Sequence, residues 1–288
     1  MKIVYFIFLF EICFVSCNNI SEQQVDDYSE TQNNTLLKSN EAVLYSVPAP
    51  TFVSSVLKSY GNIFDSHLLY ETRNKVPQAA LTSQQTLNLG VYIIDFSYTY
   101  LFGQEQLSLI YLSKFDVIMN ELNLKSPETT GALIRLRENI NNNDSVKKIV
   151  NDYQSKLGNY FINEDRDALG LYVLSGMYIE GLYLTLGSYK DIKNKKQMIN
   201  YKDDRFAQLL LQEETQLSNL LDLWKVMDHP DAAKIISKLT LIRESFDELN
   251  ITYDTHVKTN KIIRLNFDRS KIEKMNDAIG KIRQQIIK

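Results

Sequence analysis

The chain has 288 residues, and its 32 lysines and arginines stand against 35 aspartates and glutamates, which gives a formal net charge of −3. The lack of a basic excess argues against a nucleic-acid-binding protein and against a polybasic protein of the membrane surface. A chain of this length can bury a large hydrophobic core.

Residues 1–16 have the pattern of a secretory signal peptide. Lys2 gives a positively charged start, the apolar run "IVYFIFLF" follows it, and Ser16 is a small residue before the expected cleavage site. At about 1.5 Å per residue, this run is too short to cross a hydrocarbon core of about 30 Å. We therefore expect residues 1–16 to be removed from the mature protein.

Cys17 is the first residue after the expected cleavage site. A small residue followed by cysteine resembles the lipobox of bacterial lipoproteins, although Phe14 stands where the usual pattern has an aliphatic residue and Glu11 interrupts the apolar run. The resemblance implies that the Cys17 thiol carries diacylglycerol and that the new amino terminus is acylated too. The alternative is an ordinary secretory signal followed by an incidental cysteine.

Acylation of Cys17 would have two consequences. Two or three acyl chains would hold the protein on a membrane, because each buried CH₂ group contributes about 0.8 kcal/mol. The chain has two cysteines, and Cys13 leaves with the signal peptide, so the mature protein would keep no free thiol. We therefore expect no disulfide, no thiolate nucleophile and no cysteine metal site.

The residues after Cys17 change character abruptly. Residues 18–40 are polar and acidic, with few large apolar side chains. Such a segment cannot bury enough surface to offset the entropy lost on ordering it. The sequence therefore predicts an acylated cysteine and flexible tether over residues 17–42, and a single helical domain over residues 43–288.

The pattern from Val43 onward is helical nearly throughout. Prolines sit only where helices could begin, as at Pro127, which follows a serine cap. No Asn-Gly or Asp-Gly hairpin signal and no sustained alternation of apolar and polar residues appears. We predict an all-α multi-helix bundle of about eight to ten helices.

Two segments carry a single apolar stripe, as helices on the outside of a bundle do. Apolar residues recur at helical spacing in the last segment, at Ile272, Met275, Ile279, Ile282 and Ile286, and its charged residues, Arg283 included, lie mostly off that stripe. Residues 203–227 show the same pattern, at Phe206, Leu210, Leu217, Leu221 and Trp224. Both are predicted to be amphipathic helices.

Residues 87–103 and 169–187 are instead apolar around most of the helix circumference. Such helices belong in the middle of a larger structure or in a membrane. An acidic residue at the middle of a bilayer is costly, and the segments contain Asp95 and Glu180, so we predict two central helices buried in protein. Their similar starts, "LGVY" and "LGLY", also raise the hypothesis of a duplicated helical unit.

Asp95 and Glu180 are the strongest candidates for a functional site, since a buried carboxylate must be neutral, hydrogen-bonded or paired. The functional interpretation is a polar pocket between the two central helices, in which tyrosines such as Tyr98 and Tyr178 donate hydroxyl hydrogen bonds. The structural alternative is that a tyrosine, an arginine or a helix end binds each carboxylate and holds the helices in register.

Known catalytic and metal-binding motifs do not occur in the sequence. The three histidines lack the Glu-x-x-His spacing of helical di-iron sites, and there is no nucleophile elbow, phosphate loop or His-Glu-x-x-His motif. We therefore assign no catalytic residue, no metal site and no cofactor. Whether the protein is an enzyme stays open, with a non-enzymatic role favoured.

Three stretches, "YSVPAP" at 45–50, "LNLGVYIIDFSY" at 87–98 and "GMYIEGLYLTLG" at 176–187, resemble a family of uncharacterised helical lipoproteins from Bacteroidota. The resemblance implies an all-helical envelope protein and brings no activity with it. We expect a lipid-anchored binding or scaffold protein of the bacterial outer membrane, whose partner is an envelope protein or a small ligand and not a nucleic acid. The alternative is a small-molecule receptor or enzyme that uses a polar cavity with Asp95 or Glu180.

Overall fold

The computed structural model describes residues 51–70, 82–142, 144–150, 152, 167–194, 199–227, 229–255 and 262–287. All of them belong to one compact unit, Val43–Lys288. The predictions for the signal peptide, for Cys17 and for the tether lie outside the described residues.

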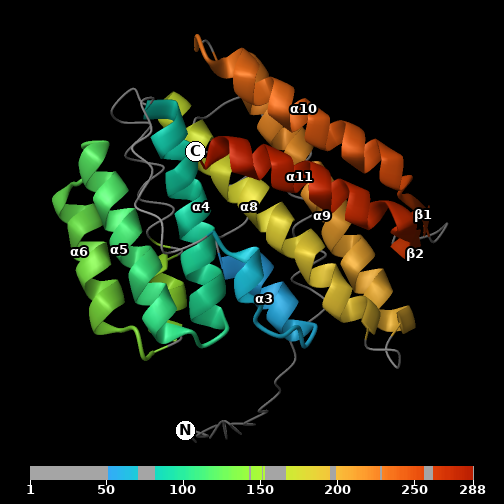
Figure 1. Ribbon diagram of the computed structural model, residues 1–288, viewed down its shortest axis with the longest axis horizontal. Helices are drawn as coiled ribbons and strands as arrows, with labels where there is room; N and C mark the ends of the chain where they lie inside the picture. The colour runs from blue at the N-terminus through green and yellow to red at the C-terminus, as the bar shows by residue number, and fades with distance from the viewer. Residues whose placement is uncertain are drawn as a thin grey trace, which may run out of the picture. The chain divides into compact units, whose positions relative to one another are not determined.

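Helices account for most of the described residues, which confirms the predicted all-α fold (Figure 1). In chain order the elements are α3 (Thr51–Ser59), the short 3₁₀ helix η1 (Ser66–Leu68), α4 (Thr82–Leu101), α5 (Glu105–Glu121), α6 (Pro127–Glu138), a helical stretch at residues 144–150, α8 (Asp167–Asn194), α9 (Ile199–Val226), α10 (Ala232–Leu249), strands β1 (Thr252–Thr255) and β2 (Ile262–Asn266), the 3₁₀ helix η2 (Arg269–Lys271) and α11 (Ile272–Ile286).

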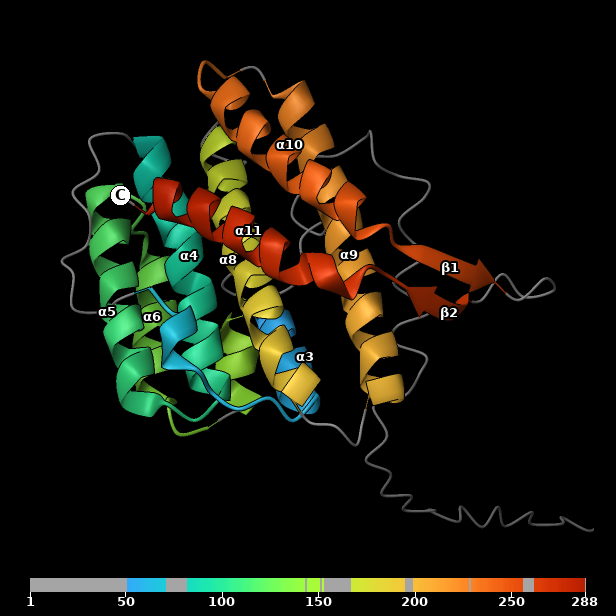
Figure 2. The same ribbon diagram turned by 45° about the vertical axis from the view of Figure 1, so that its right-hand side comes forward.

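The two nearly all-apolar segments form the centre of the bundle, as predicted. They lie in α4 and α8, and these two helices make the most extensive contact between any two elements. Helices α3 and α5 also pack on α4, whereas α9 and α11 pack on α8. Figure 2 shows α11 crossing over α8 toward α4. Because neighbours cover both central helices on most sides, apolar residues around their circumference are buried.

Burial along α8 bears on the membrane-spanning alternative. The stretch Ala168–Tyr189 is long and apolar enough to cross a membrane, but 89% of its apolar window is buried inside the protein. Every residue from 170 to 182 is buried. The helix therefore has the burial of a core helix, whose apolar residues contact other helices.

Close contact between α4 and α8 depends on one glycine from each helix. A Cβ atom at Gly90 would lie 2.2 Å from the Val173 carbonyl oxygen, and one at Gly176 would lie 2.1 Å from the Leu87 carbonyl oxygen. No side chain fits at those distances, so the two backbones touch only because both residues are glycine.

The amphipathic segments are positioned by their apolar stripes, as the periodicity predicted. In α11, the stripe residues from Ile272 to Ile286 are buried against α8 and α10. In α9, the stripe from Phe206 to Trp224 is buried likewise. One charged residue of α11, Arg283, is also buried, which its assignment to the polar side did not anticipate.

The exception to the helical pattern among the described residues is a short antiparallel hairpin of β1 and β2, which the sequence pattern did not predict. Thr252 pairs with Asn266 and Tyr253 with Leu265. These short strands are rich in β-branched and aromatic residues, which favour extended backbone. Periodicity missed them because strands this short contain too few residues to establish an alternation.

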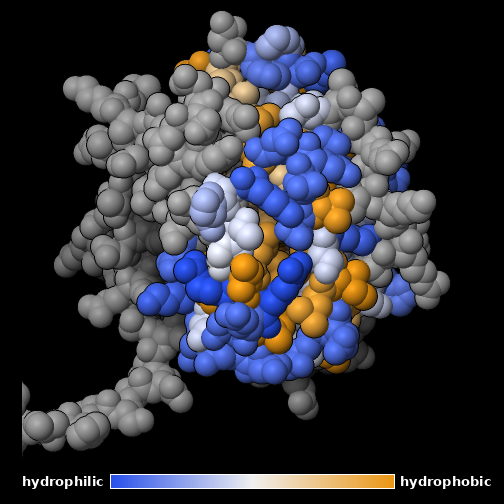
Figure 3. All heavy atoms as spheres, turned by 90° about the vertical axis from the view of Figure 1, so that its left-hand side faces the viewer, coloured by the Kyte–Doolittle hydropathy of each residue, from blue (hydrophilic) through white to orange (hydrophobic). Residues whose placement is uncertain are grey.

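A few large apolar side chains are exposed on the surface. Figure 3 shows apolar residues scattered among polar ones on the face that α5 and α6 contribute to. They include Ile110 and Val117 of α5 and Ile134 of α6. Exposed apolar residues that occur singly are normal on a folded protein, and these do not identify a binding face.

Candidate functional site

Glu180, one of the two candidate acids, forms a buried ion pair. It lies near the middle of α8, and its two carboxylate oxygens accept hydrogen bonds of 2.5 and 2.7 Å from Nε and Nη2 of Arg283 on α11. Nη2 also donates to the Leu68 carbonyl oxygen at 3.2 Å. The Arg283 guanidinium lies 4.4 Å from the ring centre of Tyr183, within the range of a cation–π contact. The pair therefore joins α8, α11 and the end of η1.

Electrostatics and burial act in opposite directions on Arg283. Burial lowers the pKa of its guanidinium, but the attraction and hydrogen bonds of Glu180, together with the attraction of Asp95 and Tyr183, outweigh burial and leave that pKa above its ordinary value. Arg283 is therefore positively charged throughout the accessible pH range. A buried guanidinium requires an anion beside it, and Glu180 supplies that anion with the two-pronged geometry that arginine prefers.

Asp95, the second candidate acid, is completely buried and lies next to Glu180. Its Oδ2 atom accepts a hydrogen bond of 3.3 Å from the backbone N–H of Tyr70, and its side chain is hydrogen-bonded to the Glu180 side chain. Its Oδ1 atom receives no hydrogen bond from a donor among the described residues. Burial first, and then the neighbouring Glu180 carboxylate, raises the pKa of Asp95 well above its ordinary value.

Polar residues of α4 and α5 border the Asp95 side of this cluster. The Tyr111 hydroxyl donates to the Tyr70 carbonyl oxygen at 2.5 Å, which fixes the turn that donates to Asp95. The Lys114 Nζ atom lies 5.5 Å from the ring centre of Tyr92. Burial lowers the pKa of Lys114, whereas Asp95 acts to raise it. Burial also raises the pKa of Tyr92 and of Tyr111 above the ordinary value, so both hydroxyls stay neutral.

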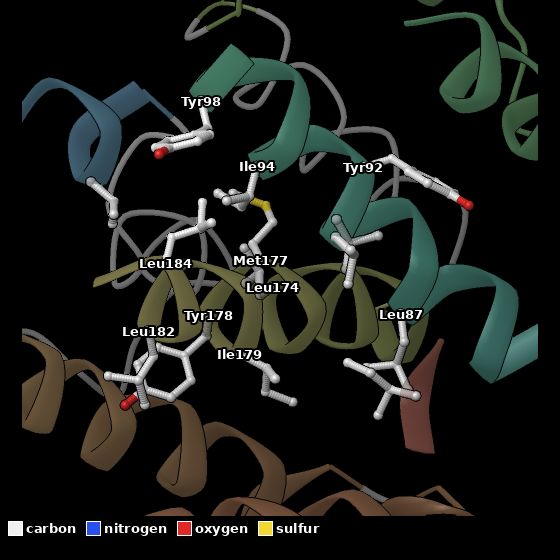
Figure 4. Packing of buried hydrophobic residues seen from close by; sticks show 14 of the residues in the cluster. Leu87, Tyr92, Ile94, Tyr98, Leu174, Met177, Tyr178, Ile179, Leu182 and Leu184 are labelled. Atoms are coloured by element: carbon white, nitrogen blue, oxygen red, sulfur yellow. The ribbon is translucent and has the colours of Figure 1, made fainter. Parts of the chain in front are cut away.

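Tyr98 and Tyr178, predicted to face the two acids, make hydrogen bonds elsewhere. The Tyr98 hydroxyl accepts from the backbone N–H of Asp65 at 3.1 Å. The Tyr178 hydroxyl donates to the Glu213 carbonyl oxygen at 3.1 Å. Figure 4 shows Tyr98 on α4 and Tyr178 on the side of α8 that faces away from α4. The structure thus brings the two carboxyl groups together, and it places these tyrosines in separate helix contacts.

A cavity of about 130 Å³ lies away from the acidic pair, between α8, η2 and the start of α11. Its lining includes Tyr189, Arg269 and Glu273, and neither Asp95 nor Glu180 belongs to it. Among the described residues, no three His, Cys, Asp or Glu side chains come close enough to hold a metal ion. The geometry of the pair is therefore that of a helix junction closed to solvent.

Sequence reasoning missed a third buried acid, Glu213 of α9. Its side chain is 1% exposed, its Oε1 atom has no hydrogen-bond partner, and burial raises its pKa to about 8. A signal was present, because residue 213 lies three after Leu210 and four before Leu217 on the apolar stripe. Arg283 carried a similar signal, four residues after Ile279. A charged residue at a stripe position is therefore a candidate for burial.

Comparison of the chain with protein-family models, with curated proteins and with solved structures finds no match. The function is therefore inferred from the residues alone.

Proposed function

We propose that the protein is a lipid-anchored helical binding or scaffold protein of a bacterial cell envelope. The observation that carries the proposal is the position of Cys17, directly after a charged start, an apolar run and a small residue. A cysteine at that boundary is where bacterial lipoproteins receive their acyl chains. The resemblance to a helical lipoprotein family of Bacteroidota supports the same assignment and favours the outer membrane.

The arrangement of charged residues in the core supports a binding role over catalysis. Glu180 is engaged by Arg283, and Asp95 by the Tyr70 backbone and by Glu180 itself. Catalytic acids need access to a substrate, whereas these acids connect helices. We infer that the protein acts through its surface, holding an envelope protein or a small ligand near the membrane.

The anchor can be tested in a bacterium that processes lipoproteins, by feeding cells an alkyne-tagged fatty acid. The full-length chain and its Cys13→Ser variant should incorporate the tag and sediment with membranes. Cys17→Ser should lose both properties, because Cys17 alone follows the cleavage site. Cys13→Ser is the matched control, since it removes the other cysteine of the chain. An unlabelled parent chain, or a Cys17→Ser variant that keeps the label, would contradict the anchor.

The binding role can be tested by crosslinking in intact cells with the acylated protein as bait. The control bait is an unrelated folded domain fused to the same residues 1–42. It crosslinks only to molecules that lie near the anchor. We expect an envelope protein or small ligand to be enriched with the full-length chain and not with the control. Identical products from both baits would argue against a partner for the helical body.

A small-molecule receptor or enzyme is the second candidate, and one observation favours it. Asp95 and Glu180 come from distant parts of the chain and lie in contact, as two acids of a polar site would. Turnover or ligand binding by the purified protein that is lost in Asp95→Asn, with the fold preserved, would support this candidate.

A further inference from the structure

The contact between Asp95 and Glu180 poses a charge problem that Arg283 alone does not solve. Two ionised carboxylates beside one guanidinium would leave a net negative charge in a site closed to water. Such a charge is strongly disfavoured, and two adjacent carboxyl groups that share a proton are the usual solution. One proton makes the trio of Asp95, Glu180 and Arg283 neutral.

The hydrogen bonds indicate where that proton resides. Both oxygens of Glu180 accept from Arg283, so Glu180 is the ionised member of the trio. Asp95 accepts one backbone hydrogen bond at Oδ2, and no donor in the described part of the chain reaches Oδ1. A protonated Asp95 carboxyl can donate to Glu180, whereas an ionised one could only repel it.

The groups that face Asp95 come from every element packed around it. The titratable and charged side chains are Tyr92 of α4, Tyr111 and Lys114 of α5, Glu180 of α8, Arg283 of α11 and Tyr70 after η1. Lys114 and Arg283 favour the ionised form of Asp95, and Glu180 favours the protonated form. Tyr92 and Tyr111 are neutral, so they add no opposing charge.

We infer that Asp95 and Glu180 form a proton-binding site that locks α11 onto α4 and α8. The lock is closed while the proton is bound, because Glu180 then has a hydrogen-bond donor on one side and Arg283 on the other. Any opening that brings the pair into water releases the proton at neutral pH. Opening therefore becomes easier as the pH rises. This inference is independent of the anchor and of the binding role.

The test must first remove Glu213, which is also completely buried among the described residues and also has a raised pKa. The parent for comparison is the Glu213→Gln chain, and the test variant adds Asp95→Asn. An asparagine amide can donate to Glu180 as the protonated acid does, but it does not titrate. Urea unfolding followed by the fluorescence of the single tryptophan, Trp224, measures stability between pH 5 and pH 9.

The expected result follows from the thermodynamic linkage between proton binding and folding. At every pH above the ordinary pKa of Asp95 and below its raised pKa in the folded protein, the folded parent holds a proton on Asp95 that the unfolded chain has lost, so its unfolding equilibrium constant should rise up to tenfold per pH unit. The Asp95→Asn variant should lose this rise and should be at least as stable as its parent at pH 8. An unchanged pH dependence, or a variant less stable than its parent at pH 8, would overturn the inference.

Two further measurements address the proton and the lock separately. Infrared spectra of the Glu213→Gln chain at pH 7 should contain the band of a protonated carboxylic acid. Absence of this band would refute the protonation of Asp95, even if the double variant fails to fold. Amide exchange over residues 272–286, corrected for the intrinsic pH effect, should show opening that increases with pH in the parent. If the corrected amide exchange of α11 does not depend on pH, the proton does not hold α11 on α4 and α8.

Discussion

Glu180 and Arg283 lie 103 residues apart in the chain and form a two-pronged ion pair from which solvent is nearly excluded. The pair connects the central helix α8 with the last helix α11. Removing one partner leaves the other charged and buried, and this costs more than the interaction itself is worth.

Arg283→Met should therefore destabilise the protein strongly. We expect a loss of about 3–5 kcal/mol in the free energy of unfolding, since Glu180 would be an uncompensated anion next to Asp95. Adding Glu180→Gln should recover part of the loss, because it removes that charge. Urea titration followed by Trp224 fluorescence measures both variants.

Lys274→Met, on the same helix, is the matched control. Lys274 pairs with Glu248 at 2.6 Å, but both side chains are largely exposed to solvent. Exposed ion pairs contribute little to stability. A loss for Lys274→Met comparable to that for Arg283→Met would show that burial does not distinguish the two pairs.

The close contact of α4 and α8 at Gly90 and Gly176 predicts that a glycine-to-alanine substitution lowers stability there and raises it at Gly131. Gly90→Ala and Gly176→Ala should each cost at least about 2–3 kcal/mol, because the new methyl group would collide with a backbone carbonyl of the other helix. Gly131→Ala in α6 should instead stabilise by about 0.5–1 kcal/mol, since nothing lies within 4 Å and alanine favours helix. Thermal or urea unfolding of the three variants checks this. Three losses of similar size would refute the close packing.

Glu213 predicts a pH-dependent stability difference. Its pKa is about 8 in the folded protein and 4.5 ordinarily, so the folded state holds an extra proton between those values. The contribution of Glu213 to the free energy of unfolding of the unmodified chain, which is the parent in this comparison, should therefore fall by about 1.4 kcal/mol per pH unit within that window. Glu213→Gln should equal the parent near pH 4 and exceed it at pH 8.

The comparison for Glu213 is the difference between variant and parent at each pH, in which any contribution of Asp95 cancels. Glu244→Gln on α10, whose side chain is exposed, serves as the control for removal of a surface carboxylate and should change stability by less than about 0.5 kcal/mol. A Glu213→Gln profile that runs parallel to that of the parent would mean that the acid ionises in the folded state as readily as in the unfolded one.

The helices and their buried faces were predictable because hydrophobic periodicity is a local property. The stripe from Ile272 to Ile286 identified both the helix and the face that it buries. The burial of Asp95 and Glu180 followed from the apolar residues around them in the sequence. The structure places both acids, at 0% exposure, in the core between α4 and α8.

The partners of those acids were not predictable, because they depend on where helices cross. Arg283 reaches Glu180 only because α11 crosses α8 at that level, and no local pattern encodes a crossing point. The hydrogen-bond partners of Tyr98 and Tyr178 were not predictable for the same reason. They occupy the expected helices but rotate away from the acids, toward Asp65 and Glu213.

The hydrogen bond between Trp224 of α9 and Ser175 of α8 provides a last prediction. The indole N–H donates to the Ser175 hydroxyl oxygen at 2.8 Å, and both side chains are fully buried. Ser175→Ala would leave that N–H without an acceptor, at an expected cost of about 1–3 kcal/mol. Ser113→Ala, at an exposed helical serine of α5, should change stability by less than about 0.5 kcal/mol. Since Trp224 is the only tryptophan, its emission reports the local change directly, and equal effects of the two substitutions would show that the buried hydrogen bond contributes nothing.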